Sequence, residues 1–247
     1  AGHHQVVLLD DAGSVVARIG SGVAGLQDGP ALRACFRDPQ GVAADADAIW
    51  VADTGNHCIR RIDLATGDVL TVAGTGARGA VLGDAAPALA TALASPWDIV
   101  PYGGGVLFAN AGTHQLGALD PAEGSVERLA GTGVEHLQDG PAADAMLAQP
   151  SGLALEGTRL FFADSETSAI RVLDLDIMEV RTLAGTGLFD FGDRNGPLAE
   201  AQFQHPLGIA MLGQHALLVA DSYNNTVRLV DLWEGTVADL DDGFTCR

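Results

Sequence analysis

The sequence predicts an all-β fold, because a segment of about 55 residues that can be divided into short strands recurs along the chain. Three markers define the repeat. A glycine-rich string such as TVAGTG ends, at intervals of 54, 57 and 54 residues, at Gly22, Gly76, Gly133 and Gly187. A second marker, such as WVADTGNHCIRRID, is anchored on Asp53, Asn110, Asp164 and Asp221. A third, such as FRDPQGVA, contains in register Pro39, Pro96, Pro150 and Pro206.

Each unit is predicted to form one antiparallel meander of four strands. In the first complete unit the later runs are AIWVAD, CIRRIDL and VLTVAG. They are almost continuously apolar, which is typical of sheets covered on both faces. In the third run the sixth and ninth places after the anchor are always apolar, for example Ile59 and Ile62. This spacing of three predicts either a bulge or two buried faces.

Radial repetition of such sheets, a β-propeller, is the arrangement that best hides their edges, and no helical period is present. We expect residues 1–22 to form the outer two strands of an incomplete blade, and whole blades over 23–76, 77–133, 134–187 and 188–247, the last with a short tail. All would belong to one propeller domain. About four and a half blades of a probable six are visible. The chain would be a fragment, be completed by a second chain or missing segment, or close irregularly.

The composition narrows the range of partners. The chain has 32 acidic residues against 13 basic ones, all of them arginine, for a formal net charge of −19. Such a surface repels nucleic acid and anionic lipid, so neither a nucleic acid nor a membrane is expected as a partner. No apolar run is long enough to cross a bilayer, and a cytoplasmic location is expected. The three cysteines form no CxxC pair and show no metal-ligand spacing.

The markers resemble the NHL-repeat family. The VAD turn followed by NHCIRRID, the AGTG strand, the DGP loop and the PxG turn cover essentially the whole chain. Strings such as FADSETSAIR and VADSYNNTVR are most similar to the propeller of thioredoxin-like/NHL-repeat proteins. In those proteins a CxxC-bearing domain precedes a six-bladed propeller. That domain and its CxxC do not occur in this sequence, so the resemblance implies a propeller here without redox chemistry.

Two groups of residues are candidates for binding. The anchors Asp53, Asn110, Asp164 and Asp221 are most simply turn residues that bond the backbone two residues on. Alternatively they form one wall of a ligand-facing loop surface. The second group follows the prolines, where the innermost strand would line a channel mouth. It comprises Gln40, Trp97, Asp98, Ser151 and Leu207. Trp97 and Asp98 depart from the glycine of the other units and could offer a stacking surface.

Two further sets recur in register. The histidines His4, His57 and His114 suggest a zinc site, but their expected separation is too large for one ion, so a polar cap is the preferred interpretation. The arginines Arg60, Arg171 and Arg228 are expected to pair with acids between blades or at the rim, contributing about 0–1 kcal/mol each. An anion-binding ring is the alternative. We therefore predict no metal site, no cofactor and no catalytic residue.

The sequence favours a non-catalytic scaffold that binds a protein or peptide partner. The competing class is a metal-dependent lyase or hydrolase-type propeller with its site at the central channel. RNA recognition is opposed by the net charge.

Overall fold

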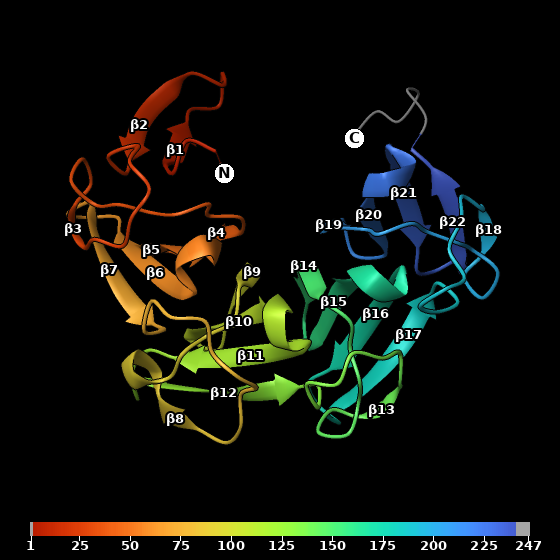
Figure 1. Cartoon of the computed structure of the whole chain (residues 1–247). Helices are drawn as coiled ribbons and strands as arrows, with labels where there is room; N and C mark the ends of the chain where they lie inside the picture. Colours follow the sequence, from red (N-terminus) through yellow and green to blue (C-terminus); the bar gives the residue numbers. More distant parts are fainter. Residues whose placement is uncertain (1, 241–247) are drawn as a thin grey trace. The chain divides into compact units, whose positions relative to one another are not determined.

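The computed structural model describes residues 2–240, and strands and short 3₁₀ turns make up its regular elements (Figure 1). The prediction of an all-β propeller fold is confirmed. The chain divides into two compact units, Ala1–Arg128 and Leu129–Arg247, and each is described separately. Within the described residues no helix has the length and apolar character needed to cross a membrane.

Unit 1 contains three sheets. Sheet I is the pair β1 (Val6–Leu9) and β2 (Val15–Ile19). Sheet II comprises β3 (Gly29–Pro30), β4 (Val42–Ala44), β5 (Ala48–Asp53), β6 (Cys58–Asp63) and β7 (Asp68–Ala73). Sheet III comprises β8 (Ala86–Pro87), β9 (Pro96–Tyr102), β10 (Gly105–Asn110), β11 (Gln115–Asp120) and β12 (Ser125–Ala130). The 3₁₀ turns are η1 (Thr54–Asn56), η2 (Ala88–Ala90) and η3 (Ala111–Thr113).

Unit 2 contains two sheets of the same design. Sheet IV comprises β13 (Gly140–Pro141), β14 (Pro150–Glu156), β15 (Arg159–Asp164), β16 (Ala169–Asp174) and β17 (Glu179–Ala184). Sheet V comprises β18 (Gly196–Pro197), β19 (Gly208–Leu212), β20 (Ala216–Asp221), β21 (Thr226–Asp231) and β22 (Thr236–Asp239). The turns η4 (Ser165–Thr167) and η5 (Ser222–Asn224) follow the second long strand of each sheet.

Each complete sheet has five strands where the sequence predicts four. The order in sheet II is β3-β7-β6-β5-β4, and the other three complete sheets repeat it. The additional strand is the two-residue Gly-Pro step of the preceding loop; Gly29 pairs with Val69, for instance. Two residues are too short to show a strand pattern in sequence. The loop therefore belongs structurally to the sheet that follows it, which determines where its side chains lie.

The third long strand shows both features that its spacing predicts. Its pairing with the fourth strand shifts register between Ile59 and Arg60 in sheet II, and between Ile170 and Arg171 in sheet IV. Its two faces are also both buried. Ile59 packs in a cluster shared by sheets II and III, whereas Ile62 packs in one shared by sheets I and II.

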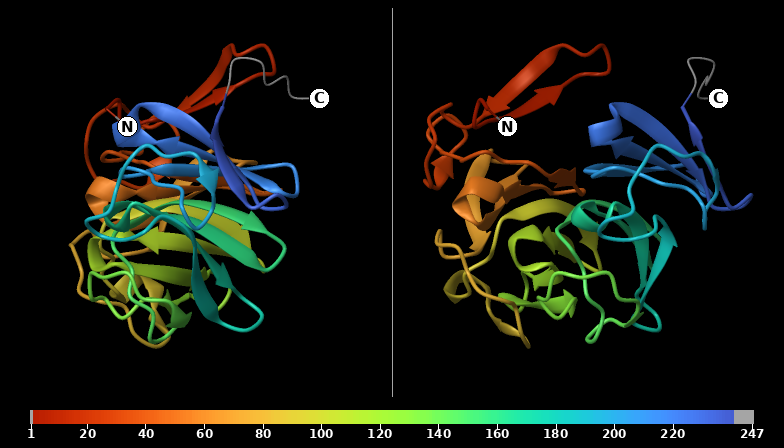
Figure 2. Two further views of the ribbon diagram at one scale, coloured as in Figure 1. Left: turned by 90° about the vertical axis from the view of Figure 1, so that its right-hand side faces the viewer. Right: turned by 45° about the vertical axis from the view of Figure 1, so that its right-hand side comes forward.

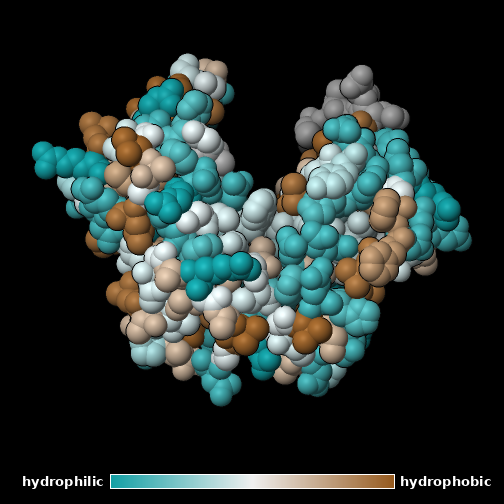
Figure 3. All heavy atoms as spheres, in the orientation of Figure 1, coloured by the Kyte–Doolittle hydropathy of each residue, from teal (hydrophilic) through white to brown (hydrophobic). Residues whose placement is uncertain are grey.

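The core lies between neighbouring sheets of a unit. In unit 2 one cluster joins the facing surfaces of sheets IV and V, which lie side by side in the views of Figure 2. Phe161 from sheet IV and Phe203 from the loop before sheet V are both fully enclosed in it. On the outside, Figure 3 shows hydrophilic side chains over much of the face in view, with apolar ones in separate groups on both units.

Glycines permit the innermost strands of neighbouring sheets to approach closely. A Cβ atom on Gly41 would lie 2.5 Å from the Cα atom of Asp98 in β9. In unit 2 a Cβ atom on Gly152 would lie 2.7 Å from the backbone nitrogen of Ile209 in β19. Both contacts are with backbone, which cannot rotate away as a side chain can. The glycine of the PxG marker is therefore a packing requirement between sheets.

We predict that Gly41→Ala destabilises unit 1 by about 1–3 kcal/mol, the usual cost of overpacking a close contact. Urea unfolding followed by tryptophan fluorescence measures the change. Gly83→Ala is the control, because a Cβ atom there meets nothing within 4 Å. Equal stability of the two variants would contradict the packing role of Gly41.

Candidate functional site

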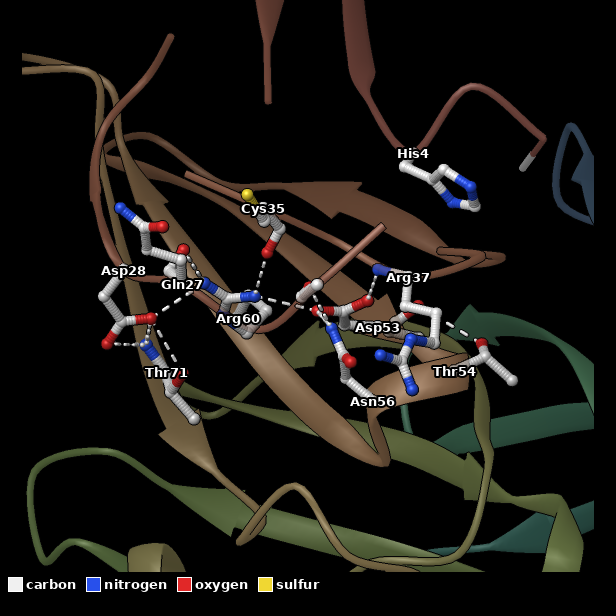
Figure 4. Close-up of polar contacts among 12 residues, drawn as sticks. His4, Gln27, Asp28, Cys35, Arg37, Asp53, Thr54, Asn56, Arg60 and Thr71 are labelled. Carbon is white, nitrogen blue, oxygen red and sulfur yellow. Dashed lines mark hydrogen bonds and ion pairs between the residues drawn. The ribbon is translucent and has the colours of Figure 1, made fainter. Parts of the chain in front are cut away.

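The anchor aspartate of each repeat is buried at the end of a strand and organises a polar network. Asp53 ends β5 and is fully buried. Its Oδ1 atom accepts a hydrogen bond from the backbone N–H of Arg37 at 2.7 Å. Its Oδ2 atom accepts hydrogen bonds from Asn56 Nδ2 and Arg60 Nη1, both at 2.8 Å (Figure 4). The predicted bond to the backbone two residues on is wrong, because the carboxylate instead holds the incoming loop 16 residues earlier.

Arg60 connects that aspartate to the same loop. Its Nη1 atom donates to the carbonyl of Cys35, and its Nη2 atom donates to the carbonyl of Gln27 and to Asp28 Oδ1 at 2.7 Å (Figure 4). The guanidinium also lies 5.1 Å from the ring centroid of Phe36. Asp28 in turn accepts hydrogen bonds from the backbone N–H and hydroxyl of Thr71 in β7. The arginine thus fastens the loop onto its own sheet.

The prediction of exposed arginines that pair between blades or at the rim is wrong. The side chains of Arg60, Arg171 and Arg228 are all 0% exposed. Each pairs with the buried anchor aspartate of its own sheet and with groups of its own loop. The sequence does not reveal this, because an arginine between apolar residues can occupy either face of a strand. A buried pair differs from a surface pair, since removing one partner leaves an uncompensated charge.

Sheet IV repeats the arginine contacts of sheet II, although Thr167 takes the place of Asn56. Arg171 contacts Asp164 Oδ2 at 2.8 Å and Asp139 Oδ1 at 2.9 Å. Asp139 accepts hydrogen bonds from the backbone N–H and hydroxyl of Thr182. The recurring QDGP string before each of these sheets was the available sequence signal for the loop aspartate. It was missed because the string has the composition of an ordinary turn.

Sheet V has the same arginine, but one of its acidic partners occupies a different position in the sheet. Arg228 contacts Asp221 at 3.0 Å, while the loop position of Asp139 is occupied by Asn195, which accepts a hydrogen bond at 2.5 Å. The lost carboxylate is replaced by Asp239 on β22, at the place of Thr182, with its Oδ1 atom 3.0 Å from Arg228 Nε. Asp193 adds a further contact from the loop at 3.0 Å.

Sheet III lacks both charges of the central pair. Asn110 replaces the aspartate and Gly117 replaces the arginine. The ring of Phe108 fills the vacated space, since a Cβ atom on Gly117 would lie 2.3 Å from it. The loop is held instead by Gln115, whose Oε1 accepts from the N–H of Leu82 and whose Nε2 donates to the carbonyl of Leu82. The two ionised groups are thus absent together.

Burial raises the pKa of Asp53, Asp164 and Asp221. Hydrogen bonds from the loop backbone and the charge of the paired arginine oppose this effect. A shifted pKa is also typical of active-site carboxylates. The oxygen atoms of these three aspartates, however, are hydrogen-bonded to groups of their own sheet and loop.

The structure separates the predicted binding residues into two groups. The anchors Asp53, Asn110, Asp164 and Asp221 are fully buried and do not form a surface wall. Ser151 is also buried, and its hydroxyl lies 2.6 Å from that of Ser165. In unit 1, Gln40 is exposed and Trp97 and Asp98 are half-buried. The close approach of Gly41, just before β4, to Asp98 in β9 places Gln40 near Trp97 and Asp98.

The histidine position links neighbouring sheets. His4, His57 and Ser168 all have left-handed backbones that end a tight turn. His4 Nδ1 accepts the N–H of Asp38 at 3.1 Å, and His57 Nδ1 accepts that of Ser95 at 3.0 Å. At the equivalent place Ser168 Oγ accepts an N–H from the next sheet of its unit. Among the described residues no three His, Cys, Asp or Glu side chains are grouped as a metal site would require.

We predict that Arg171→Met lowers the free energy of unfolding by about 3–5 kcal/mol, because it leaves Asp164 charged and buried without its cation. Adding Asp164→Asn should recover part of the loss, since sheet III has the same strand order with both charges absent. A double-mutant cycle measured by urea unfolding tests this. A double variant no more stable than Arg171→Met would show that the charge is not the cause.

His57 makes a pH-dependent contribution to stability. Burial, followed by the charges of Arg78 and Arg37, lowers the pKa of His57. The unfolded chain therefore binds a proton more readily, and the folded state loses stability as the pH falls from about 6.5 through the lowered pKa. We predict that His57→Asn, which copies Asn225 at the equivalent turn, unfolds with a smaller drop in melting temperature between pH 7.5 and 5. Parallel pH profiles of the two proteins would contradict the assignment.

Comparison with known proteins identifies one of the repeats that contain this network. A family model described as "NHL repeat" matches residues 36–62, which include Asp53 and Arg60. The chain is 38% identical to NHL repeat-containing protein 2 of Gallus gallus over 93% of its own length and 36% of that protein. It therefore spans about a third of this relative.

Solved structures support the fold class. The chain superposes on an auxiliary nutrient binding protein from Bacteroides ovatus with a TM-score of 0.63 and 19% identity, over 84% of this chain and 50% of that one. It also superposes on virginiamycin B lyase from Staphylococcus aureus with a TM-score of 0.58 and 12% identity, over 98% of this chain and 64% of that one. At such identities the likeness shows the fold alone. The repeats, the NHL-repeat match at residues 36–62 and the similarity over 93% of this chain support its assignment to the NHL-repeat family of β-propellers.

Proposed function

We propose that the chain is a non-catalytic scaffold whose loop face binds a protein or peptide partner. The observation that carries the proposal is the buried network of each complete sheet. It fixes the long loop before the sheet at several points, as Arg60 does through Gln27, Asp28 and Cys35. Loops held this way lose little conformational freedom on binding, so more of the contact energy remains as affinity.

The recurring arginines and anchor aspartates, which the sequence offers as candidates for binding, fix the loops instead. Arg60, Arg171 and Arg228 hold loops, and the anchor aspartates with which they pair are fully buried. This favours a structural use of the ionisable groups over a catalytic one. The likeness to virginiamycin B lyase extends only to the fold, so we do not advance a lyase or hydrolase activity.

In unit 1 we propose that the partner contacts Gln40, Trp97 and Asp98. Gln40 lies just before β4 and is exposed, and Trp97 and Asp98 lie on β9 and are partly accessible. An aromatic side chain beside polar groups is a common composition of a protein-binding surface. The net charge of −19 favours a protein partner over a nucleic acid or an anionic membrane. A second chain or missing segment that completes the propeller remains part of this proposal.

Selection of a displayed peptide library on the purified chain tests the proposal. We expect enriched peptides whose affinity falls about tenfold, equivalent to 1.4 kcal/mol, on Gln40→Arg or Trp97→Ala. Leu64→Ser is the control, because Leu64 is exposed in the turn between β6 and β7 and bonds to Asp47 after β4, whereas Gln40 lies before that strand. Circular dichroism verifies that each variant is folded. Failure to enrich any peptide over a scrambled library, or an equal effect of all three substitutions, would argue against the scaffold.

A further inference from the structure

Exposed aromatic side chains gather on one loop and one turn of sheet V. Phe189 is 93% exposed and Phe191 is 53% exposed, both on the loop between β17 and β18. Tyr223, in η5, is 62% exposed. We call Phe189, Phe191 and Tyr223 the aromatic patch. Each lies in unit 2, in the cyan-to-blue part of the chain in Figure 1.

The loop that carries the patch is fastened on both sides of Phe191. Asp190 accepts hydrogen bonds from Gln202 Nε2 at 2.7 Å and, at its carbonyl, from the hydroxyl of Thr186 at 3.0 Å. The N–H of Gly192 donates to the carbonyl of Phe203, and the carbonyl of Gly192 accepts from Asn224 Nδ2 at 2.7 Å. The last bond places the loop directly beside η5 and Tyr223.

Tyr223 is supported from behind by groups of both sheets. Its ring stacks on His205 with a centroid separation of 4.5 Å. His205 Nδ1 lies 4.0 Å from Glu166 Oε1 in η4, and that oxygen also accepts a hydrogen bond from Gln149. A ring held in this way needs no further ordering before a partner contacts its exposed side.

The fold does not require aromatic residues at these places. The corresponding loops before sheets II and IV are two residues shorter, and their exposed large apolar residues are Val23 and Leu26 in the first and Val134 in the second. At the middle of the turn, Tyr223 is replaced by Gly55 in η1 and by Glu166 in η4. Several large aromatic side chains exposed together are unusual on a protein surface and mark an interaction site.

Charge around the patch indicates the chemistry of the partner. Glu166 lies beside His205, on which Tyr223 stacks, and the loop that carries Phe189 and Phe191 contains Asp190, Asp193 and the cation Arg194. Arg228 is fully buried and engaged with Asp193, Asp221 and Asp239, so it offers no positive surface. A second copy of the chain would bring like charges together at this patch, whereas a basic segment would be attracted to it.

We propose that the aromatic patch is a docking site for a basic, partly apolar segment of a partner protein. Arginine or lysine side chains of that segment would stack on Phe191 and Tyr223 and reach the carboxylates of Glu166 and Asp190. This inference rests on the scaffold function and specifies the partner class for one part of the loop face.

The test uses a fluorescein-labelled nonapeptide of alternating arginine and leucine, and its glutamate–leucine counterpart, in anisotropy titrations at 0.15 M salt. We expect Phe191→Ser/Tyr223→Ser to weaken binding of the arginine peptide about tenfold, which corresponds to 1.4 kcal/mol. Trp233→Ser should change it less than about twofold, within ordinary contact scatter. Trp233 is a matched control, because it is an aromatic residue of the same sheet that is 77% exposed and lies in the turn between β21 and β22.

Phe189→Ser is a second variant with little risk to folding, and it should weaken binding in the same direction. Equal affinity of all the variants, an equal loss in Trp233→Ser, or equal binding of the glutamate peptide would overturn the proposal. Self-association of the wild type that is lost in the double variant would assign the patch to a second copy instead. If library peptides still bind the double variant through Gln40 and Trp97, the scaffold function stands and only this docking site fails.

Discussion

The fold depends on a buried ion pair that recurs in three of the four complete sheets. In each of them a fully buried arginine joins the aspartate at the end of one strand to the loop that precedes the sheet. Without this pair the loop would be held by a few buried apolar side chains, such as Phe36 and Phe203, and by neutral hydrogen bonds. The pair therefore fixes the long loop against its sheet. The exposed surface that the loops form is ordered as a result.

Variation among the repeats shows how strictly the buried charges are balanced. Sheet V loses the loop aspartate to Asn195 but gains Asp239 on the fourth strand. Sheet III loses the central aspartate and arginine together and fills the space with Phe108. No described complete sheet retains the buried arginine without a buried aspartate. The arginine and the aspartate are kept or lost together because an uncompensated buried charge costs much free energy. Replacing the whole ion pair by well-packed apolar groups changes the free energy only modestly.

Much of the architecture could be predicted from the sequence because strand length and apolar periodicity are local properties. The two-faced burial of Ile59 and Ile62 is an example. The burial of Arg60 could not be predicted, since it depends on a register shift beside it and on a loop about 30 residues earlier. The anchor aspartates were expected in turns; each ends the strand just before a 3₁₀ turn, and its contact with that loop was not expected. The aromatic patch was missed for a related reason. Phe203 and Phe189 belong to the same connection, yet one is enclosed and the other exposed, and only the course of the backbone distinguishes them.

The attachment of each loop to the sheet that follows it also sets the boundaries of the portable module. A cassette taken from this protein for engineering should begin after the AGTG strand of one unit and end after that of the next. It then contains each loop together with the third and fourth strands that hold it. Transplanting the loop of sheet V into sheet II without Asp239 would leave Arg60 with the carboxylates of Asp53 and Asp193, two instead of the three that Arg228 contacts in sheet V. Chimeric propellers with new recognition loops are therefore best assembled by exchanging whole cassettes rather than the loops alone.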